Sequence, residues 1–111
     1  MIVGISDYQT ETIPDLQFAH KDAEIFSEYL QSKAGGELGK EQIMLLTNEQ
    51  ATTGQLGAAL DWLMEESQPG DQAIVYFSGH GDVETKTKMN HGFLLTYDSP
   101  ASVYIANNSR R

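Results

Sequence analysis

Short apolar, strand-like runs alternate with longer amphipathic segments along the 111 residues of this chain. Three runs are expected to be strands covered on both faces: residues 2–5, 43–46 and 73–77. A strand–helix–strand–helix–strand order predicts parallel pairing through right-handed crossovers, with helices on both faces of the sheet. We therefore expect an α/β protein of the three-layer α-β-α type with a mainly parallel sheet. At 12.3 kDa the chain holds one core, so we assign residues 1–111 to one domain.

Two amphipathic segments are expected to form the helices between these strands. In the first, the apolar stripe consists of Ala19, Ala23, Phe26 and Leu30, and Gly35-Gly36 is expected to end the helix. The second helix is expected to start at Thr52, with Gln55 as its capping-box partner. Its predicted apolar face is formed by Leu56, Ala59, Leu60, Leu63 and Met64.

The remaining segments are expected to be connections and one further strand. Residues 68–71 predict a turn, and residues 82–91 predict a polar loop or an exposed hairpin. Residues 93–97 predict a strand that is closed by Asp98, a residue that either orients a loop or touches substrate.

Charge and composition exclude several functional classes. Seven basic and sixteen acidic residues give a net charge of −9, which would be repelled by nucleic acid and by anionic membranes. No apolar run approaches the roughly 20 residues that span a bilayer, and we expect a cytoplasmic protein. The chain contains no cysteine, which excludes disulfides, thiolate metal sites and a thiol nucleophile within these residues.

The segment that points to chemistry is Ser78-Gly79-His80-Gly81, directly after the strongest predicted strand. In parallel α/β sheets, functional residues gather beyond the carboxyl ends of the strands. An imidazole ordinarily titrates near pH 6.5, which suits proton transfer, and Gly81 adds a backbone N–H that could stabilise an oxyanion. The alternative is a plain turn that carries an exposed histidine.

Other chemistries fit the same segment less well. A nucleophile elbow needs glycine where Tyr76 stands, and a dinucleotide fingerprint needs glycine where Glu84 stands. A metal site could draw on His80, Asp82, Glu84 and His91, but their spacing matches no zinc pattern. We therefore predict no metal site.

Four blocks in order along the chain resemble the caspase-like cysteine peptidases, nearest the metacaspases and their bacterial relatives. The blocks are residues 3–8, 16–23, 73–81 and 92–95, the last followed by Tyr97-Asp98. The resemblance implies a caspase-like fold and a cysteine–histidine dyad that cleaves peptide bonds without a bound cofactor, although some metacaspases are activated by calcium. It implies that His80 is the catalytic histidine and that Gly81 donates its N–H to the oxyanion.

The chain departs from this family in lacking the cysteine. In caspases the histidine lies about 50 residues before the nucleophile, and only 31 residues follow His80 (111 − 80 = 31). We expect the histidine-bearing N-terminal part of a catalytic domain, truncated before the nucleophile strand and inactive alone. Its exposed sheet edge would pair with the remainder of the domain or with a second copy.

The substrate class also follows from the resemblance. Leu16 and Gln17 are neutral where aspartate-cutting caspases carry an arginine, which argues against acidic substrates. Asp22 and Ser78 match residues that line the pocket of metacaspases for Arg or Lys, so peptide or protein substrates cut after a basic residue are expected. Asp22 equally suits a carboxylate that stabilises the first turn of a helix. The rival functions are a catalytically dead interaction domain and a flavodoxin-like binder of small ligands.

Overall fold

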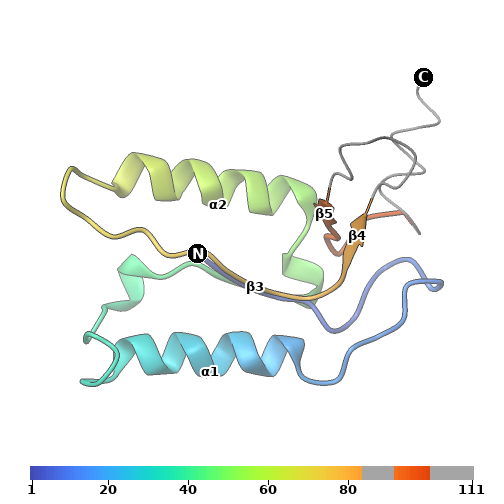
Figure 1. The fold of residues 1–111 in the computed structure, drawn as a ribbon, viewed down its shortest axis with the longest axis horizontal. Helices are drawn as coiled ribbons and strands as arrows, with labels where there is room; N and C mark the ends of the chain where they lie inside the picture. The colour runs from blue at the N-terminus through green and yellow to red at the C-terminus, as the bar shows by residue number, and fades with distance from the viewer. Residues whose placement is uncertain (84–91, 101–111) are drawn as a thin grey trace.

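A computed structural model describes residues 1–83 and 92–100 of the chain. Its α-helices are α1 (Ala19–Gln31) and α2 (Thr53–Glu66), and its strands are β1 (Ile2–Gly4), β2 (Leu45–Thr47), β3 (Tyr76–Ser78), β4 (Gly81–Val83) and β5 (Gly92–Leu94). Short 3₁₀ turns, η1 (Lys40–Gln42) and η2 (Asn48–Gln50), flank β2. Figure 1 shows α1 and α2 on opposite faces of the sheet, so the predicted three layers are confirmed.

The main sheet is parallel, as predicted, with the strand order β2-β1-β3. The first strand begins where the alternation indicates, but β2 and β3 begin later in the chain than predicted. Ile2 opens β1 opposite both Leu45 and Tyr76, so the ladder begins only at these residues. The predicted strands 43–46 and 73–77 are wrong by two or three residues at their starts for this reason.

The side chains of β1 alternate between the two layers of the core. Val3 and Ile5 pack with Leu46, Ala51 and Ala59 on the α2 side. Ile2 packs with Ala23 and Leu30 on the α1 side. Because both faces of β1 are covered, its residues are all buried, which confirms a strand of the central type.

Helix α1 lies unusually close to β1 at Gly4. A β-carbon at this position would lie 2.4 Å from the Ala19 carbonyl oxygen and 2.5 Å from the Ala23 β-carbon. The helix ends at Gln31, four residues before the predicted stop at Gly35-Gly36. Its end is set by Ser32, whose backbone is extended and whose hydroxyl donates to the Tyr29 carbonyl at 2.6 Å.

Helix α2 starts as predicted. The Thr52 side chain accepts the Gln55 N–H at 3.2 Å, which is the first of the two hydrogen bonds of a capping box. The predicted apolar face is only partly buried: Ala59 is buried, whereas Leu60 and Met64 are exposed at 44% and 76%. The prediction that Leu60 and Met64 are buried is therefore wrong. They are exposed because the three-stranded sheet of the described residues is narrower than the apolar stripe of the helix.

Strands β4 and β5 pair as an antiparallel hairpin. The loop or exposed hairpin predicted for residues 82–91 lies outside the described residues beyond Val83, so it stays a prediction. The predicted strand 93–97 is wrong at its carboxyl end. The chain turns after Leu95, because the Thr96 N–H donates to the Ser99 hydroxyl at 2.7 Å and the Ser99 N–H donates to the Thr96 carbonyl at 3.1 Å.

Candidate functional site

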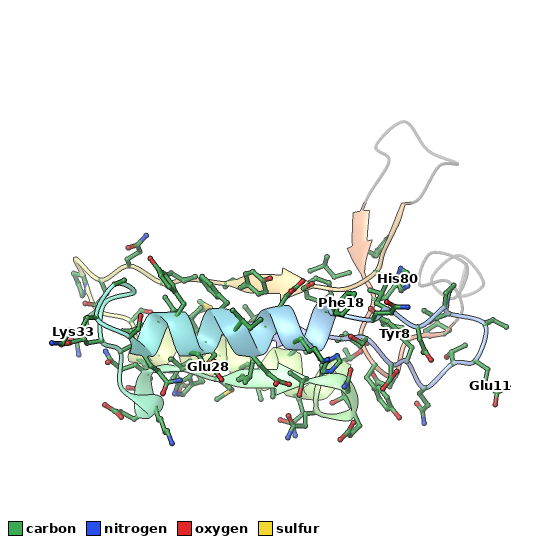
Figure 2. All side chains as sticks on the ribbon, turned by 90° about the horizontal axis from the view of Figure 1, so that it is seen from below. Tyr8, Glu11, Phe18, Glu28, Lys33 and His80 are labelled. Carbon is green, nitrogen blue, oxygen red and sulfur yellow. The ribbon has the colours of Figure 1, made fainter. Side chains whose placement is uncertain are left out.

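The Gly79–Gly81 segment lies at the carboxyl edge of the sheet, between the end of β3 and the start of β4. This is the edge at which α/β proteins ordinarily bind ligands. Figure 2 shows His80 beside Tyr8, with Phe18, the residue that precedes α1, at the same end of the molecule. His80 itself is half-buried rather than fully exposed.

The imidazole of His80 is held by a backbone carbonyl. Its Nε2 lies 2.7 Å from the Pro14 oxygen, and because a carbonyl only accepts, Nε2 carries the proton of the neutral ring. The lone pair therefore lies on Nδ1, which is the atom able to take up a proton. The Tyr8 ring packs against the imidazole with the centroids 5.4 Å apart.

The backbone of His80 is fixed as well. Its N–H donates to the Tyr8 hydroxyl at 2.8 Å, and its carbonyl accepts the Leu95 N–H at 3.0 Å. Desolvation raises the pKa of the buried Tyr8 phenol, partly opposed by the hydrogen bond from His80, so the hydroxyl stays neutral. Gly79 is required by this contact, because a β-carbon there would lie 2.8 Å from the Tyr8 oxygen.

The register of the hairpin decides where the Gly81 N–H points. Since the Leu95 N–H donates to His80, the pair of Gly81 and Leu94 falls at a non-hydrogen-bonded position of the antiparallel ladder. The Gly81 N–H is therefore directed away from β5. Gly81 is also exposed, so its N–H is placed to donate to a ligand.

Ser78 and Asp22 are placed differently from the histidine loop. Ser78 ends β3 half-buried, and its carbonyl accepts the Ile5 N–H at 2.9 Å. Asp22 lies in the first turn of α1 with an exposed side chain, four residues after Phe18. Within the described residues no hydrogen bond joins Asp22 to Ser78 or His80, so its role in the site stays a prediction.

Sequence reasoning did not assign Tyr8 or Pro14 to the site. Tyr8 belongs to the first of the four motif blocks, and that position was the available signal. Pro14 contributes a backbone oxygen, and no side-chain pattern can reveal a carbonyl acceptor that reaches a ring 66 residues away.

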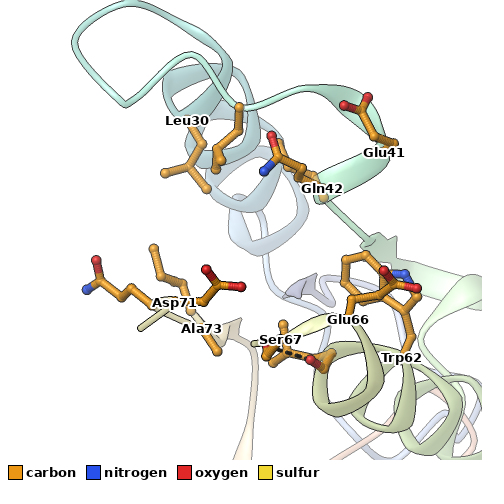
Figure 3. A pocket seen from close by; sticks show the side chains of 13 residues that line it. Leu30, Glu41, Gln42, Trp62, Glu66, Ser67, Asp71 and Ala73 are labelled. Atoms are coloured by element: carbon orange, nitrogen blue, oxygen red, sulfur yellow. Dashed lines mark hydrogen bonds between the residues drawn. The ribbon is translucent and has the colours of Figure 1, made fainter. Parts of the chain in front are cut away.

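Two of the cavities formed by the described residues lie away from the four predicted site residues, none of which lines them. The larger, about 380 Å³, lies before the amino ends of β2 and β3 and has Trp62, Glu66 and Asp71 among its walls (Figure 3). The smaller, about 340 Å³, lies between β2 and the start of α2.

The described part of the chain contains neither a metal-holding group of side chains nor a membrane-spanning helix. No three acidic or histidine side chains in residues 1–83 and 92–100 are grouped so that they could hold a metal ion. Glu84 and His91, two of the residues considered for a metal, lie outside the described residues. No described helix has the length and apolar character needed to cross a bilayer.

Asp98 orients a loop, which resolves one of the alternatives left open by the sequence. Its Oδ1 accepts the Thr53 N–H at the start of α2 at 2.9 Å and the Thr96 hydroxyl at 2.9 Å. Desolvation acts to raise the pKa of this carboxyl, but the hydrogen bonds from Thr53 and Thr96 outweigh it and lower the pKa.

The lowered pKa of Asp98 predicts an acid-dependent loss of stability. The ionised carboxylate stabilises the fold above its ordinary pKa of 3.8, and this contribution disappears as the pH falls through the lowered value. We expect Asp98→Asn to lower the free energy of unfolding by about 1 kcal/mol at neutral pH, as for a lost helix cap. Urea denaturation across a pH series should show this difference shrinking at the acid end, whereas Asp61→Asn, exposed on α2, should change little throughout. A difference independent of pH would contradict the assignment.

Helices on both faces of a parallel sheet, with a glycine-framed histidine at its carboxyl edge, agree with the caspase-like class of α/β proteins. The sequence matches the family described as metacaspase, peptidase C14 domain, over residues 1–108. The chain therefore belongs to this family, and its predicted caspase-like fold is confirmed. No curated protein matches the chain significantly.

Proposed function

We propose that this chain supplies the acid–base histidine of a cysteine-type endopeptidase that cuts after Arg or Lys. The observation that carries the proposal is the 2.7 Å hydrogen bond between His80 Nε2 and the Pro14 carbonyl. It assigns the proton of the neutral ring to Nε2 and leaves Nδ1, at the carboxyl edge of the sheet, to act as the base.

In the proposed reaction His80 first accepts a proton from the thiol and then donates a proton to the leaving amine. Nδ1 takes the proton of a cysteine thiol, and the thiolate attacks the carbonyl carbon of the scissile peptide bond. The resulting oxyanion accepts the Gly81 N–H, and His80 then gives its proton to the departing amine as the C–N bond breaks. Water, deprotonated by the same imidazole, hydrolyses the thioester. No bound cofactor is needed for these steps.

The sulfur has to come from outside the 111 residues, because they contain no cysteine. We propose that the remainder of the catalytic domain brings it along the free side of β3. In the described sheet β3 is an end strand, and Val75, just before it, is 55% exposed. A parallel strand paired there would end beside His80, because the carboxyl ends of parallel strands share one edge.

The preference for basic substrates is supported by charge. Asp22 presents an exposed carboxylate in the first turn of α1, and the chain has a net charge of −9. Leu16 and Gln17 offer no cation to an acidic substrate. A basic side chain is the complement of this surface.

The test uses the parent polypeptide that includes a cysteine-bearing segment, assayed with fluorogenic peptides that carry Arg, Lys or Asp before the scissile bond. We expect cleavage after Arg and Lys, and Asp22→Asn should lower kcat/KM for these by about 10-fold to 100-fold through loss of a charged hydrogen bond. Glu24→Gln, exposed in the same helix, is the matched control. Preference for Asp would overturn the proposed specificity.

The absence of cysteine also favours a second candidate, a catalytically dead interaction domain on the same fold. This candidate predicts that the parent polypeptide cleaves none of the three peptides while it still folds.

A further inference from the structure

Every described hydrogen bond of His80 goes to one of two segments. Tyr8 and Pro14, which accept from its backbone N–H and its Nε2, belong to the segment of residues 8–14, here the 8–14 loop. Leu95, which donates to its carbonyl, immediately precedes the turn of residues 96–99, here the 96–99 turn. The histidine therefore lies between these two segments.

The two segments are also bonded directly to each other. The Gln9 N–H donates to the Tyr97 carbonyl at 3.0 Å, and the Thr10 hydroxyl donates to the Ser99 carbonyl at 2.6 Å. Within the 8–14 loop, the Ile13 N–H donates to the Thr10 carbonyl at 3.1 Å, so Thr10 is linked to the residue that precedes Pro14. These contacts close a ring of hydrogen bonds through His80, the loop and the turn.

The 96–99 turn is in turn fixed to helix α2. Asp98 accepts the Thr53 N–H at 2.9 Å, and the Tyr97 N–H donates to the Ala51 carbonyl, just before the helix, at 2.9 Å. Ser99 is 5% exposed, and its hydroxyl lies 2.8 Å from that of Thr96. The turn is therefore anchored to the start of α2.

We propose that Thr10 and Asp98 are positioning residues for His80: through the 96–99 turn they hold the 8–14 loop, whose Pro14 carbonyl selects the imidazole tautomer. In the described part of the chain, neither residue is hydrogen-bonded to the imidazole. The inference rests on the proposed role of His80 in proton transfer, since only then does the tautomer decide activity. The effect of the 96–99 turn on the tautomer of His80 can be measured without any assay of peptide cleavage.

The test is nitrogen-15 NMR of the 111-residue chain at about pH 8.5, two units above the ordinary imidazole pKa. In the wild-type chain the ring shifts of His80 should report one tautomer, with the proton on Nε2. Thr10→Val removes the hydroxyl while keeping the shape, and it should lower the ratio of the Nε2–H to the Nδ1–H tautomer by about threefold to tenfold. Thr10→Ser should restore the wild-type ratio.

Two controls separate positioning from general destabilisation. Thr12→Val, at an exposed residue of the same loop, should leave the His80 shifts unchanged. His20, whose Nδ1 lies 2.7 Å from the Ser6 hydroxyl, should keep its shifts in all variants. Asp98→Asn should shift His80 in the same direction as Thr10→Val, from the α2 end of the network. Unchanged His80 shifts in folded Thr10→Val and Asp98→Asn would overturn the inference, whereas an inactive parent polypeptide with the expected shifts would overturn only the proposed function.

Discussion

Replacement of His80 by alanine is expected to lower kcat for peptide cleavage by a factor of about 10²–10⁴ in the cysteine-bearing parent polypeptide. The reason is that Nδ1 of His80, at the carboxyl edge of the sheet, is the atom proposed to take up the thiol proton. His20, the other described histidine, lies at the start of α1 with its Nδ1 2.7 Å from the Ser6 hydroxyl, outside the Gly79–Gly81 segment. Steady-state kinetics with an Arg peptide measure the effect.

The matched control is His20→Ala, which removes an imidazole of the same size from outside the proposed site. It should retain a kcat close to wild type once the folded fraction has been measured by circular dichroism. Turnover by His80→Ala equal to that of the wild type would remove His80 from the mechanism, and with it the proposed function.

Substitution of Gly4 by alanine is expected to produce the largest loss of stability. The new β-carbon would lie 2.4 Å from the Ala19 carbonyl oxygen and 2.5 Å from the Ala23 β-carbon, so α1 would have to move away from the sheet. Ala19 and Ala23 belong to α1, which packs on one of the two buried faces of β1. Neither contacting atom is the end of a flexible side chain. We expect a decrease in the free energy of unfolding of about 3 kcal/mol.

Urea denaturation gives the size of this change, and Gly57→Ala is its control. Gly57 lies within α2, and a β-carbon there meets no atom within 4 Å. Alanine at that position should therefore stabilise the chain by about 0.5–1 kcal/mol, since it lowers the entropy of the unfolded state. A Gly4→Ala variant as stable as the wild type would contradict the close approach of α1 to β1 at this position.

The sequence predicted the order and type of the main elements because their signals are local. The alternation of apolar runs with helical stripes depends on the side chains of neighbouring residues, and so does the cap at Thr52. The bounds of β2 and β3 were less accurate. A strand begins where its partner strand begins. Ile2 of β1 pairs with Leu45 and Tyr76, which lie more than 40 positions away in the chain, so local sequence does not reveal these starts.

Leu60 and Met64 show a second limit of the same kind. Helical periodicity assigned both to the apolar face of α2, and the period is right. Whether that face is buried depends on the width of the sheet beneath it. The residues of the helix itself carry no information about that width. Their exposure at 44% and 76% follows from the three strands that the sheet contains in the described residues.

For the candidate site, the sequence alone singled out His80 as the candidate for proton transfer. A histidine between two glycines after an apolar strand is a local pattern, and His80 lies at the predicted edge. Only the tertiary structure decided which ring nitrogen is free, since that depends on the Pro14 carbonyl, 66 residues earlier in the chain. It also decided that Asp98 supports a helix terminus. Every residue has a backbone carbonyl, and every residue except proline has a backbone N–H. Hydrogen bonds between these groups in distant segments therefore cannot be predicted from the identities of the residues.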